Sequence, residues 1–312
     1  MEYEINESKS ILDYKKNLNY DLMMKYIDVF CRRYPFIGVT NLGHSIMGRE
    51  IPMITLGKGK PCFLYVGAHG AGEWLTSIIL LRFVNEYCEL YKNKSRIYNS
   101  TLEYLYMNKT VYVVPMLNPD GVDYRINGVT DENILYDRLF RMNGESSDFS
   151  AWQANGRGVE LKLNYNCDFT ERKKIEAEKE IYDGSPSGYG GTAPESEPET
   201  GALCNFLRFN DSIKGVLSLY RGKDEIRYSN GDRITKRSHP IAKSMSRMSG
   251  YDLVVGEKCE QIGNLLGWCI SELDVPTFEV SFAEEKMNFN QDLLFKSYAD
   301  MREVLFAFPL ML

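Results

Sequence analysis

Short apolar runs alternate along this chain with longer segments in which apolar residues recur every three or four positions. Continuous apolar runs of this length are typical of buried strands, and they predict strands at Ile51–Leu56, Phe63–Gly67, 110–117, 215–220 and 276–282. The helical period predicts helices at Tyr20–Tyr34, 72–91, 196–210, 236–250 and 289–308. Strands alternating with helices indicate a mainly parallel or mixed sheet with helices on both faces.

The strand ends are where chemistry is expected in such a fold, because ligands bind beyond the carboxyl ends of the strands. The segments that follow Val66, Pro115, Leu219 and Val280 are therefore the candidates. The stretch 118–193 is rich in Asn, Asp, Gly and Tyr. A loop region of this length inside a compact domain is usually functional.

Two local signals refine this prediction. The sequence GKGKP at 57–61 is typical of a tight turn and predicts a hairpin between the first two strands. Ser196 and Glu199 have the spacing of a capping box, in which the side chains at the cap and three residues later satisfy the first backbone N–H groups.

Composition limits the classes of function. The 312 residues fit one large domain, and without a repeat or a low-complexity linker we expect a single domain over 1–312. The net charge is -6 with no basic stripe, which argues against nucleic acid. No segment reaches the about 20 apolar residues of a membrane span, and the polar N-terminus is unlike a signal peptide. Seven scattered cysteines without a CxxC pair favour a reducing cytoplasm.

The segment GAHGAGEWLTS after Val66 resembles the metal-binding segment of zinc carboxypeptidases. Further motifs of that family follow in the same order across nearly the whole chain: NPDG at 118–121, RLFR at 138–141, NGRGVELKLNY at 155–165, SEPET at 196–200 and PTFEVSF at 276–282. The text DFSAWQANGRGVEL is most similar to the bacterial branch that cleaves γ-D-glutamyl–diamino-acid bonds in cell-wall peptides. The resemblance implies a three-layer α/β/α fold with a mixed, mainly parallel twisted sheet of about eight strands.

The resemblance also implies a chemistry. Two histidines and a glutamate hold zinc, and the metal activates a water molecule and polarises the scissile carbonyl. On this register Glu73 occupies the glutamate ligand position and Glu279 the position of the general base. Arg141, the second arginine of RLFR, takes the place of the residue that faces the oxyanion and the substrate.

Both histidine ligand positions differ from the family pattern. Gly70 stands where the first imidazole is expected, and Tyr220 stands where the second is expected. A phenol with a pKa near ~10 is a poor zinc ligand at neutral pH. His69 is one residue away, which turns its side chain to the opposite face of a strand end. The chain has only three histidines, so a two-histidine site is difficult to build in any register.

The substrate clamp also departs from the pattern. Lys162 and Leu163 replace an Asn-Arg pair, so a point charge remains but the bidentate fork is lost. Asn164 keeps the flanking pattern. We therefore expect Arg141, Lys162, Asn164 and Tyr220 to bind substrate. The plainer interpretations are a surface arginine for Arg141 and a space-filling side chain for Tyr220.

Three hypotheses follow. The first is a non-catalytic homologue that needs no cofactor and binds a peptide, a peptidoglycan-derived fragment or a protein partner. The second is an active metallocarboxypeptidase with a rearranged zinc site, in which Glu73, His69 and either Tyr220 or Asp224 hold the metal. The third is a structural role with a vestigial cleft.

Overall fold

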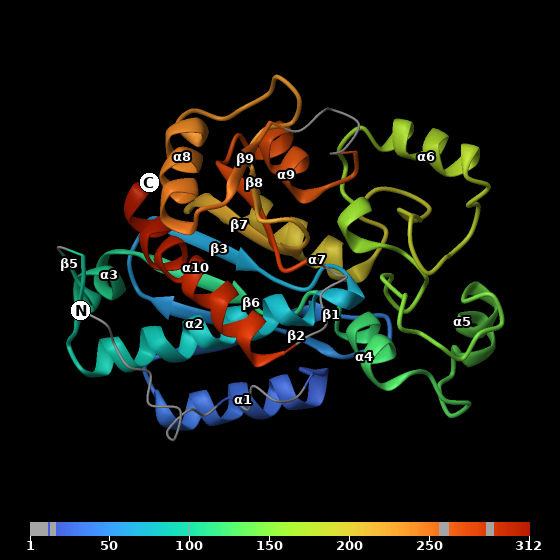
Figure 1. Ribbon diagram of the computed structural model, residues 1–312, viewed down its shortest axis with the longest axis horizontal. Coiled ribbons are helices and arrows are strands. Elements are labelled where there is room, and N and C mark those ends of the chain that lie inside the picture. The colour runs from blue at the N-terminus through green and yellow to red at the C-terminus, as the bar shows by residue number, and fades with distance from the viewer. Residues whose placement is uncertain (1–11, 13–16, 99, 256–261, 285–289) are drawn as a thin grey trace.

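The computed structural model describes residue 12 and residues 17–98, 100–255, 262–284 and 290–312 (Figure 1). Its main feature is an eight-stranded sheet in the order β1-β2-β6-β3-β7-β10-β8-β9. The strands are β1 (Gly38–His44), β2 (Glu50–Gly57), β3 (Cys62–Val66), β6 (Thr110–Val114), β7 (Ile213–Arg221), β8 (Glu225–Arg227), β9 (Asp252–Val254) and β10 (Thr277–Phe282). A separate pair contains β4 (Arg96–Ile97) and β5 (Ser100–Thr101).

The four central strands, β6, β3, β7 and β10, run parallel to one another. Strand β2 is antiparallel to both of its neighbours, and β8 is antiparallel to β10. The predicted mixed, mainly parallel sheet of about eight strands is therefore confirmed. Because parallel strands end at the same edge, the segments after β3, β7 and β10 lie next to one another.

Helices cover both faces of the sheet (Figure 1). They are α1 (Tyr20–Arg33), α2 (Trp74–Lys92), α3 (Leu102–Asn108), α4 (Pro119–Asn127), α5 (Tyr136–Met142), α6 (Phe169–Glu178), α7 (Pro198–Arg208), α8 (Ser238–Ser249), α9 (Leu265–Trp268) and α10 (Gln291–Met311). No helix in the described ranges combines the length and the apolar character that crossing a membrane requires.

The alternation of side chains along β3 separates two apolar layers. Phe63 and Tyr65 pack into the layer that contains α1, α2, α8 and α10. Leu64 and Val66 pack into the opposite layer, with Leu203 of α7 and other residues of α7 and α9. Both layers are buried, as expected for strands that are apolar along their whole length. The three-layer α/β/α architecture is therefore confirmed.

The predicted hairpin at 57–61 is wrong. Strand β6 lies between β2 and β3 and pairs with both of them, through Ile54 with Val113 on one side and Tyr65 with Val113 on the other. Residues 57–61 connect β2 to β3, which are not paired with each other because β6 lies between them. An apolar run such as TVYVV suits this central place because both of its faces are buried.

The predicted capping box is also wrong. Helix α7 begins at Pro198 with Glu197 as its cap. The carboxylate of Glu199 is buried and accepts hydrogen bonds from the Ile46 backbone N–H at 3.3 Å and from Asn155 Nδ2 at 3.2 Å. Glu199 therefore braces distant segments, and it does not form a capping box with Ser196, whose backbone N–H donates to the Ala193 carbonyl. The long stretch 118–193 is less irregular than expected, because it contains α4, α5 and α6.

Candidate active site

The candidate site lies at the carboxyl ends of β3, β7 and β10. Ser218 of β7 is paired with Val66 of β3 on one side and with Glu279 of β10 on the other, and Tyr220 is paired with Ser281. Residues two apart on a strand share a face of the sheet. Tyr220 and Glu279 therefore project from the face that α7 and α9 cover.

Four of the side chains selected from the sequence meet at this edge. Glu73, Lys162, Tyr220 and Glu279 line one cavity of about 350 Å³. Glu73 and Lys162 also line a neighbouring cavity of about 510 Å³. We call the two adjoining cavities the cleft. The fold thus assembles residues that are more than 200 positions apart in the chain, between Glu73 and Glu279.

Glu279 is the titratable centre of the cleft. Its Oε1 accepts a hydrogen bond of 2.9 Å from Asn264 Nδ2, and Arg227 lies opposite it on β8. Burial raises the pKa of Glu279 to about 7, against the opposing charges of Arg227 and Lys162. The charge of Glu73 adds a smaller upward shift to this pKa. A carboxyl group in this range can gain or lose a proton at neutral pH, as a general base must.

Glu73 is held differently. It ends the short 3₁₀ turn Ala71–Glu73 before α2 and is only 3% exposed. Its Oε2 accepts a hydrogen bond of 2.9 Å from the backbone N–H of Gly70. A Cβ atom on Gly70 would lie 3.0 Å from Gln153 Oε1 and 3.2 Å from Glu73 Cδ. The first expected ligand position thus has no donor side chain and little space beside it.

His69 is buried and packs against the rings of Tyr165 and Tyr220. Its Nε2 lies 2.9 Å from the hydroxyl oxygen of Tyr165, and its ring stacks on Tyr220 with 5.2 Å between centroids. Burial, helped by the charge of Lys162, lowers the pKa of His69 to about 3, so its ring is neutral. Its Nδ1 has no hydrogen-bond partner among the residues that the structure describes.

The residues at the expected ligand positions do not fit the zinc site that the resemblance implies. Burial and the charge of Glu279 raise the pKa of Tyr220 well above its ordinary value, which keeps its phenol protonated. Gly70 has no donor, and the Nε2 of His69 already contacts a tyrosine hydroxyl. Within the described residues, no three His, Cys, Asp or Glu side chains are grouped so that they could hold a metal ion.

The two clamp positions, Lys162 and Leu163, both line the cleft, one with a charged side chain and the other with an apolar one. Lys162 forms an ion pair with Glu160 at 2.8 Å and lines both cavities. Leu163 lines both cavities too. A ligand in the cleft would meet an ammonium group and an aliphatic surface, and would not meet a planar fork.

Asn164 is buried away from the cavity lining and braces a loop. Its Nδ2 donates to the Gly190 carbonyl at 2.6 Å and to Ser196 Oγ at 3.0 Å. Its Oδ1 accepts from the Glu197 backbone N–H at 3.1 Å and from Thr200 Oγ1 at 2.5 Å. These contacts give Asn164 a bracing role, and its substrate-binding role stays a prediction.

Arg141 is not brought together with the other candidates. It lies in the last turn of α5, where its side chain is exposed and its Nε donates to the Asp137 carbonyl at 3.2 Å. The described residues that line the cleft do not include it. Its oxyanion and substrate roles also stay predictions.

Among the lining residues that the sequence analysis did not select are Arg221, Arg227 and Asn264. Arg221 follows Tyr220 at the end of β7, so its place at the strand end was a usable signal. The pairing of Arg227 with Glu279 depends on the neighbour of β10, which no local pattern reveals. Asn264 caps α9 through its Oδ1 and bonds Glu279 through its Nδ2, and only the first of these contacts is local in sequence.

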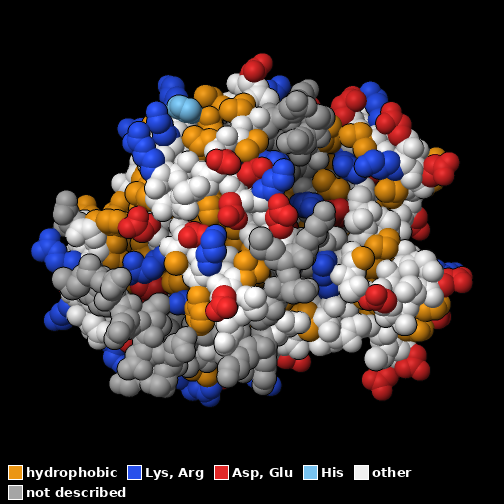
Figure 2. Space-filling view, viewed as in Figure 1, with side chains coloured by type: hydrophobic (Ala, Val, Ile, Leu, Met, Phe, Trp, Pro, Cys, Tyr) orange, Lys and Arg blue, Asp and Glu red, His pale blue; other side chains and the backbone are white. Residues whose placement is uncertain are grey.

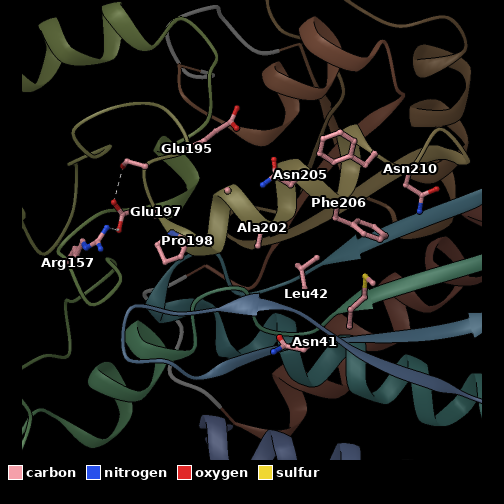
Figure 3. Close-up of a pocket in the computed structure, with 14 residues that line it drawn as sticks. Asn41, Leu42, Arg157, Glu195, Glu197, Pro198, Ala202, Asn205, Phe206 and Asn210 are labelled. Atoms are coloured by element: carbon pink, nitrogen blue, oxygen red, sulfur yellow. Dashed lines mark hydrogen bonds and ion pairs between the residues drawn. The ribbon is translucent and has the colours of Figure 1, made fainter.

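A second hollow of about 910 Å³ lies between α7 and the strands β1 and β2 (Figure 3). Leu42 and Phe206 form part of its apolar wall, and Arg157 lies 3.8 Å from Glu197 at one end. None of the candidate catalytic, substrate-binding or metal-ligating residues is among the described residues that line it. The candidate chemistry therefore belongs to the cleft.

Comparisons with known proteins found similarity over most of the chain. Residues 23–253 match the family described as zinc carboxypeptidase. Gamma-D-glutamyl-L-diamino acid endopeptidase 1 of Lysinibacillus sphaericus is 30% identical over 266 residues, 85% of this chain and 65% of that protein. Human carboxypeptidase O is 29% identical over 203 residues, 64% of this chain and 47% of that protein. The chain thus spans between 47% and 65% of these two relatives.

Solved structures show the same fold. The structure of bovine thrombin-activatable fibrinolysis inhibitor in complex with tick carboxypeptidase inhibitor matches with a TM-score of 0.70. The match has 19% sequence identity and covers 96% of this chain and 97% of that chain. At this identity the likeness concerns the fold alone.

Proposed function

The chain belongs to the zinc carboxypeptidase family, and from that premise we propose that it binds a peptide in the cleft without hydrolysing it. One observation carries the proposal. The position where the resemblance implies the first imidazole is Gly70, which has no side-chain donor and whose backbone N–H donates a hydrogen bond to Glu73 Oε2. A hydrolytic zinc site needs three protein ligands and an open position for water.

The surroundings of that position support the same proposal. His69 and Tyr220 stack on each other as neutral rings, and a Tyr165 hydroxyl contacts the imidazole. Aromatic packing thus stands where the resemblance implies metal ligands. We therefore propose that the protein needs no cofactor and is a non-catalytic homologue.

The ligand that we propose is a peptide or a peptidoglycan-derived fragment. The bacterial relative is named as a gamma-D-glutamyl-L-diamino acid endopeptidase, and this name supports the proposed ligand class. The cleft presents hydrogen-bonding side chains to such a ligand, because Lys162, Asn264 and Glu279 line it.

A second candidate function is an active metallocarboxypeptidase with a rearranged zinc site. The observation that favours it is the cleft position of Glu279, whose pKa burial raises to about 7. This group would serve as the base if a metal bound, with Glu73 and His69 as the residues nearest to a ligand set. The expected substrates would be peptides or γ-D-glutamyl-diamino-acid bonds of cell-wall peptides.

One experiment separates the two functions. The full chain is purified, supplied with zinc and freed of excess metal, and bound zinc is measured by elemental analysis beside a peptidase assay. We expect far less than one zinc per chain and no turnover of a γ-D-glutamyl-diamino-acid peptide. One tightly held zinc with turnover that Glu279→Gln abolishes would overturn the binding proposal.

A constructive experiment tests the assignment of the ligand positions. The double variant Gly70→His, Tyr220→His is expected to bind zinc more tightly than the natural chain, because it restores both imidazoles beside Glu73. The matched control is Gly70→Ala, Tyr220→Phe, which changes the same positions without adding a ligand. Equal zinc affinity of the two double variants would show that these are not the metal positions.

We also propose a cytoplasmic location. The support is chemical, because the described cysteines, which include the buried Cys62, Cys88 and Cys204, are free thiols. Free thiols persist in reducing compartments. Cell fractionation tests this location, and recovery of the protein outside the cytoplasm would contradict it.

A further inference from the structure

Residues 155–164, which we call the clamp segment, connect α7 to the wall of the cleft. The two clamp positions belong to this segment and line both cavities. The start of α7 holds the segment at both ends. Asn155 Nδ2 donates to Glu199 Oε2 at 3.2 Å at one end, and Asn164 Oδ1 accepts from the Glu197 backbone N–H at 3.1 Å at the other. The place of the clamp positions therefore depends on contacts with α7.

Asn155 organises the first half of the clamp segment. Its Oδ1 accepts hydrogen bonds from the backbone N–H groups of Arg157 at 3.0 Å and of Val159 at 3.1 Å, which close a turn. Glu160 follows this turn, and its Oε1 lies 2.8 Å from Lys162 Nζ. The turn therefore connects Asn155 to an ion pair that lines the cleft.

The Asn155 amide also joins two buried carboxyl groups. Its Nδ2 donates to Glu197 Oε2 at 2.8 Å as well as to Glu199, so both carboxyl groups contact one nitrogen atom. Asp120 of α4 lies close to them, because Asp120 and Glu199 accept from neighbouring backbone N–H groups of the turn between β1 and β2. All three acids are buried. The start of α7 thus belongs to an enclosed group of three carboxyl groups.

The cations near this group pair with only two of the acids. Arg49 lies 3.6 Å from Asp120, and Arg157 lies 3.8 Å from Glu197, which it faces in Figure 3. Within the described part of the chain, no Lys, Arg or His forms an ion pair with Glu199. On the molecular surface drawn in Figure 2, by contrast, acidic and basic side chains interleave. Glu199 is therefore enclosed without a cation of its own.

This environment favours the neutral form of Glu199. Burial, helped by the charges of Asp120 and Glu197, raises the pKa of Glu199 to about 8, against a smaller opposite effect of the hydrogen bond from Asn155. Because this value lies above the ordinary 4.5, the enclosed state loses stability as the pH rises through the raised pKa. An ionised Glu199 would be stabilised by water. Water is near on the Asn155 side, because Arg157 and Glu197 line the hollow of about 910 Å³.

We propose that Glu199 is a positioning residue for the cleft, which holds Asn155 and the clamp segment against α7 while its carboxyl group is neutral. When the group ionises, the clamp segment separates from α7 on the side of the hollow, and Lys162 and Leu163 leave their places in the cleft wall. This inference rests on the proposed binding function and gives it a pH-dependent group besides Glu279. Glu199 is not among the described residues that line the cleft, so its effect on a ligand passes through the clamp segment.

Hydrogen exchange of the clamp segment tests this role without a ligand. The natural chain and Glu199→Gln are compared by mass spectrometry at equal pH, so that the chemical rate of exchange cancels. At about pH 9 the clamp segment of the natural chain is expected to exchange about tenfold faster than that of Glu199→Gln, because the Gln side chain cannot ionise. At about pH 6 the two chains should exchange at similar rates, because Glu199 is then neutral.

Two controls show whether the effect is local and specific. Glu171→Gln changes an exposed acid of α6 and should follow the natural chain at both pH values. The central strand β6 should stay protected over the same times, because it opens only with the whole fold. If β6 exchanges as fast as the clamp segment, the whole fold opens, and the positioning role is overturned.

A second substitution separates the charge of Glu199 from its hydrogen bonds. Glu199→Ala removes both acceptor oxygens, so its clamp segment is expected to exchange fast at both pH values. Glu199→Gln keeps the shape of the side chain, and its clamp segment should stay protected at both. If Glu199→Ala does not fold, the comparison of the natural chain with Glu199→Gln decides alone.

A labelled γ-D-glutamyl-L-lysine peptide tests the consequence in the cleft. Fluorescence anisotropy gives its dissociation constant for the natural chain and for Glu199→Gln. The ratio of the two constants removes the titration of Glu279, which both chains share. This ratio is expected to rise about fivefold between about pH 6 and about pH 9, because the natural chain alone loses the clamp positions. A constant ratio beside a clear difference in exchange would overturn the role of Glu199 in the cleft.

The outcomes separate this inference from the function on which it rests. If the peptide binds neither chain at either pH, the proposed binding function fails, and the role in the cleft fails with it. If the peptide binds but the exchange of the two chains has the same pH dependence, binding stands and the inference is overturned. Slower exchange in the natural chain than in Glu199→Gln at high pH would show that the ionised carboxylate holds Asn155 more tightly, which also overturns the inference.

Discussion

The two sides of the cleft keep their functional groups in opposite states. On the β3 and β7 side, His69 and Tyr220 are neutral, buried and stacked on each other. On the β10 side, Glu279 lines the cavity among charged and polar groups, and its pKa is about 7. The first arrangement resembles a protein core and the second a working site. Substitutions should therefore change mainly stability on the first side and mainly pH dependence on the second.

The largest effect is expected from His69→Ala. The substitution opens a cavity beside two aromatic rings and removes the contact with Tyr165, so we expect a loss of about 2–4 kcal/mol in the free energy of unfolding. Chemical denaturation measures this loss. Tyr165→Phe is the control, because it removes only the hydroxyl and should lower stability by about 1 kcal/mol.

Zinc sharpens the same experiment. If the β3 and β7 side is core and not a metal site, zinc should leave the melting temperature of the natural chain and of His69→Ala unchanged. A rise in melting temperature with zinc that disappears in His69→Ala would make His69 a ligand. That result would contradict the interpretation of the β3 and β7 side as part of the core.

Glu279→Gln should change the pH dependence of stability. The folded pKa of about 7 lies above the ordinary value of 4.5, so the folded state binds this proton more tightly than the unfolded state does. The associated stability is present at low pH and is lost as the pH rises through the folded pKa. Between about pH 5 and pH 8 the free energy of unfolding of the natural chain should fall by about 1–3 kcal/mol relative to that of the variant. This figure is already lowered to allow for screening by solvent.

The control for this experiment is another acid of the same cavity. Glu225→Gln should keep the fall in stability with pH, because Glu225 lies in an ion pair with Arg227. Burial raises the pKa of Glu199 to about 8. Because Glu199 is present in the natural chain and in both variants, its contribution cancels when their stabilities are compared. Parallel pH profiles for the natural chain and Glu279→Gln would contradict the assignment.

Asn264→Ala should have a smaller effect on the same group. Loss of the 2.9 Å hydrogen bond removes a donor that favours the ionised carboxylate. The pKa of Glu279 should then rise by about one unit or less, the shift that about 1 kcal/mol of lost interaction produces. NMR titration of the carboxyl carbon measures it, and a fall in the pKa would show that the amide favours the neutral form.

The smallest effect is expected from Gly70→Ala. The added Cβ would meet the Gln153 side-chain oxygen at 3.0 Å, and a flexible side chain can move, so the loss should stay below about 1 kcal/mol. Gly67→Ala is the matched control, because its Cβ would lie 2.8 Å from the Pro115 backbone carbonyl, which cannot move easily. A larger loss of stability from Gly70→Ala than from Gly67→Ala would mean that residue 70 has no room for a larger side chain, in addition to lacking an imidazole.

The sequence alone determined where the central strands lie in the chain and the identity of several groups in the cleft. Apolar runs located the central strands because strands buried on both faces are apolar along their whole length. Motif order placed Glu73 at a helix start after a strand and Glu279 inside the last core strand, and both line the cleft. It also established that Gly70 and Tyr220 are not histidines, since residue identity does not depend on the fold.

Only the tertiary structure decided what those groups contact. The Tyr165 hydroxyl reaches His69 across 96 positions of sequence. The Asn264 amide reaches Glu279 because the start of α9 lies beside β10. The tertiary structure also decided that β6 lies between β2 and β3 and that Arg141 is not among the described residues that line the cleft. Local patterns report burial and periodicity, whereas strand order and loop paths depend on pairing between distant segments. For this protein, that pairing determines which carboxylate stays titratable and which histidine becomes part of the core.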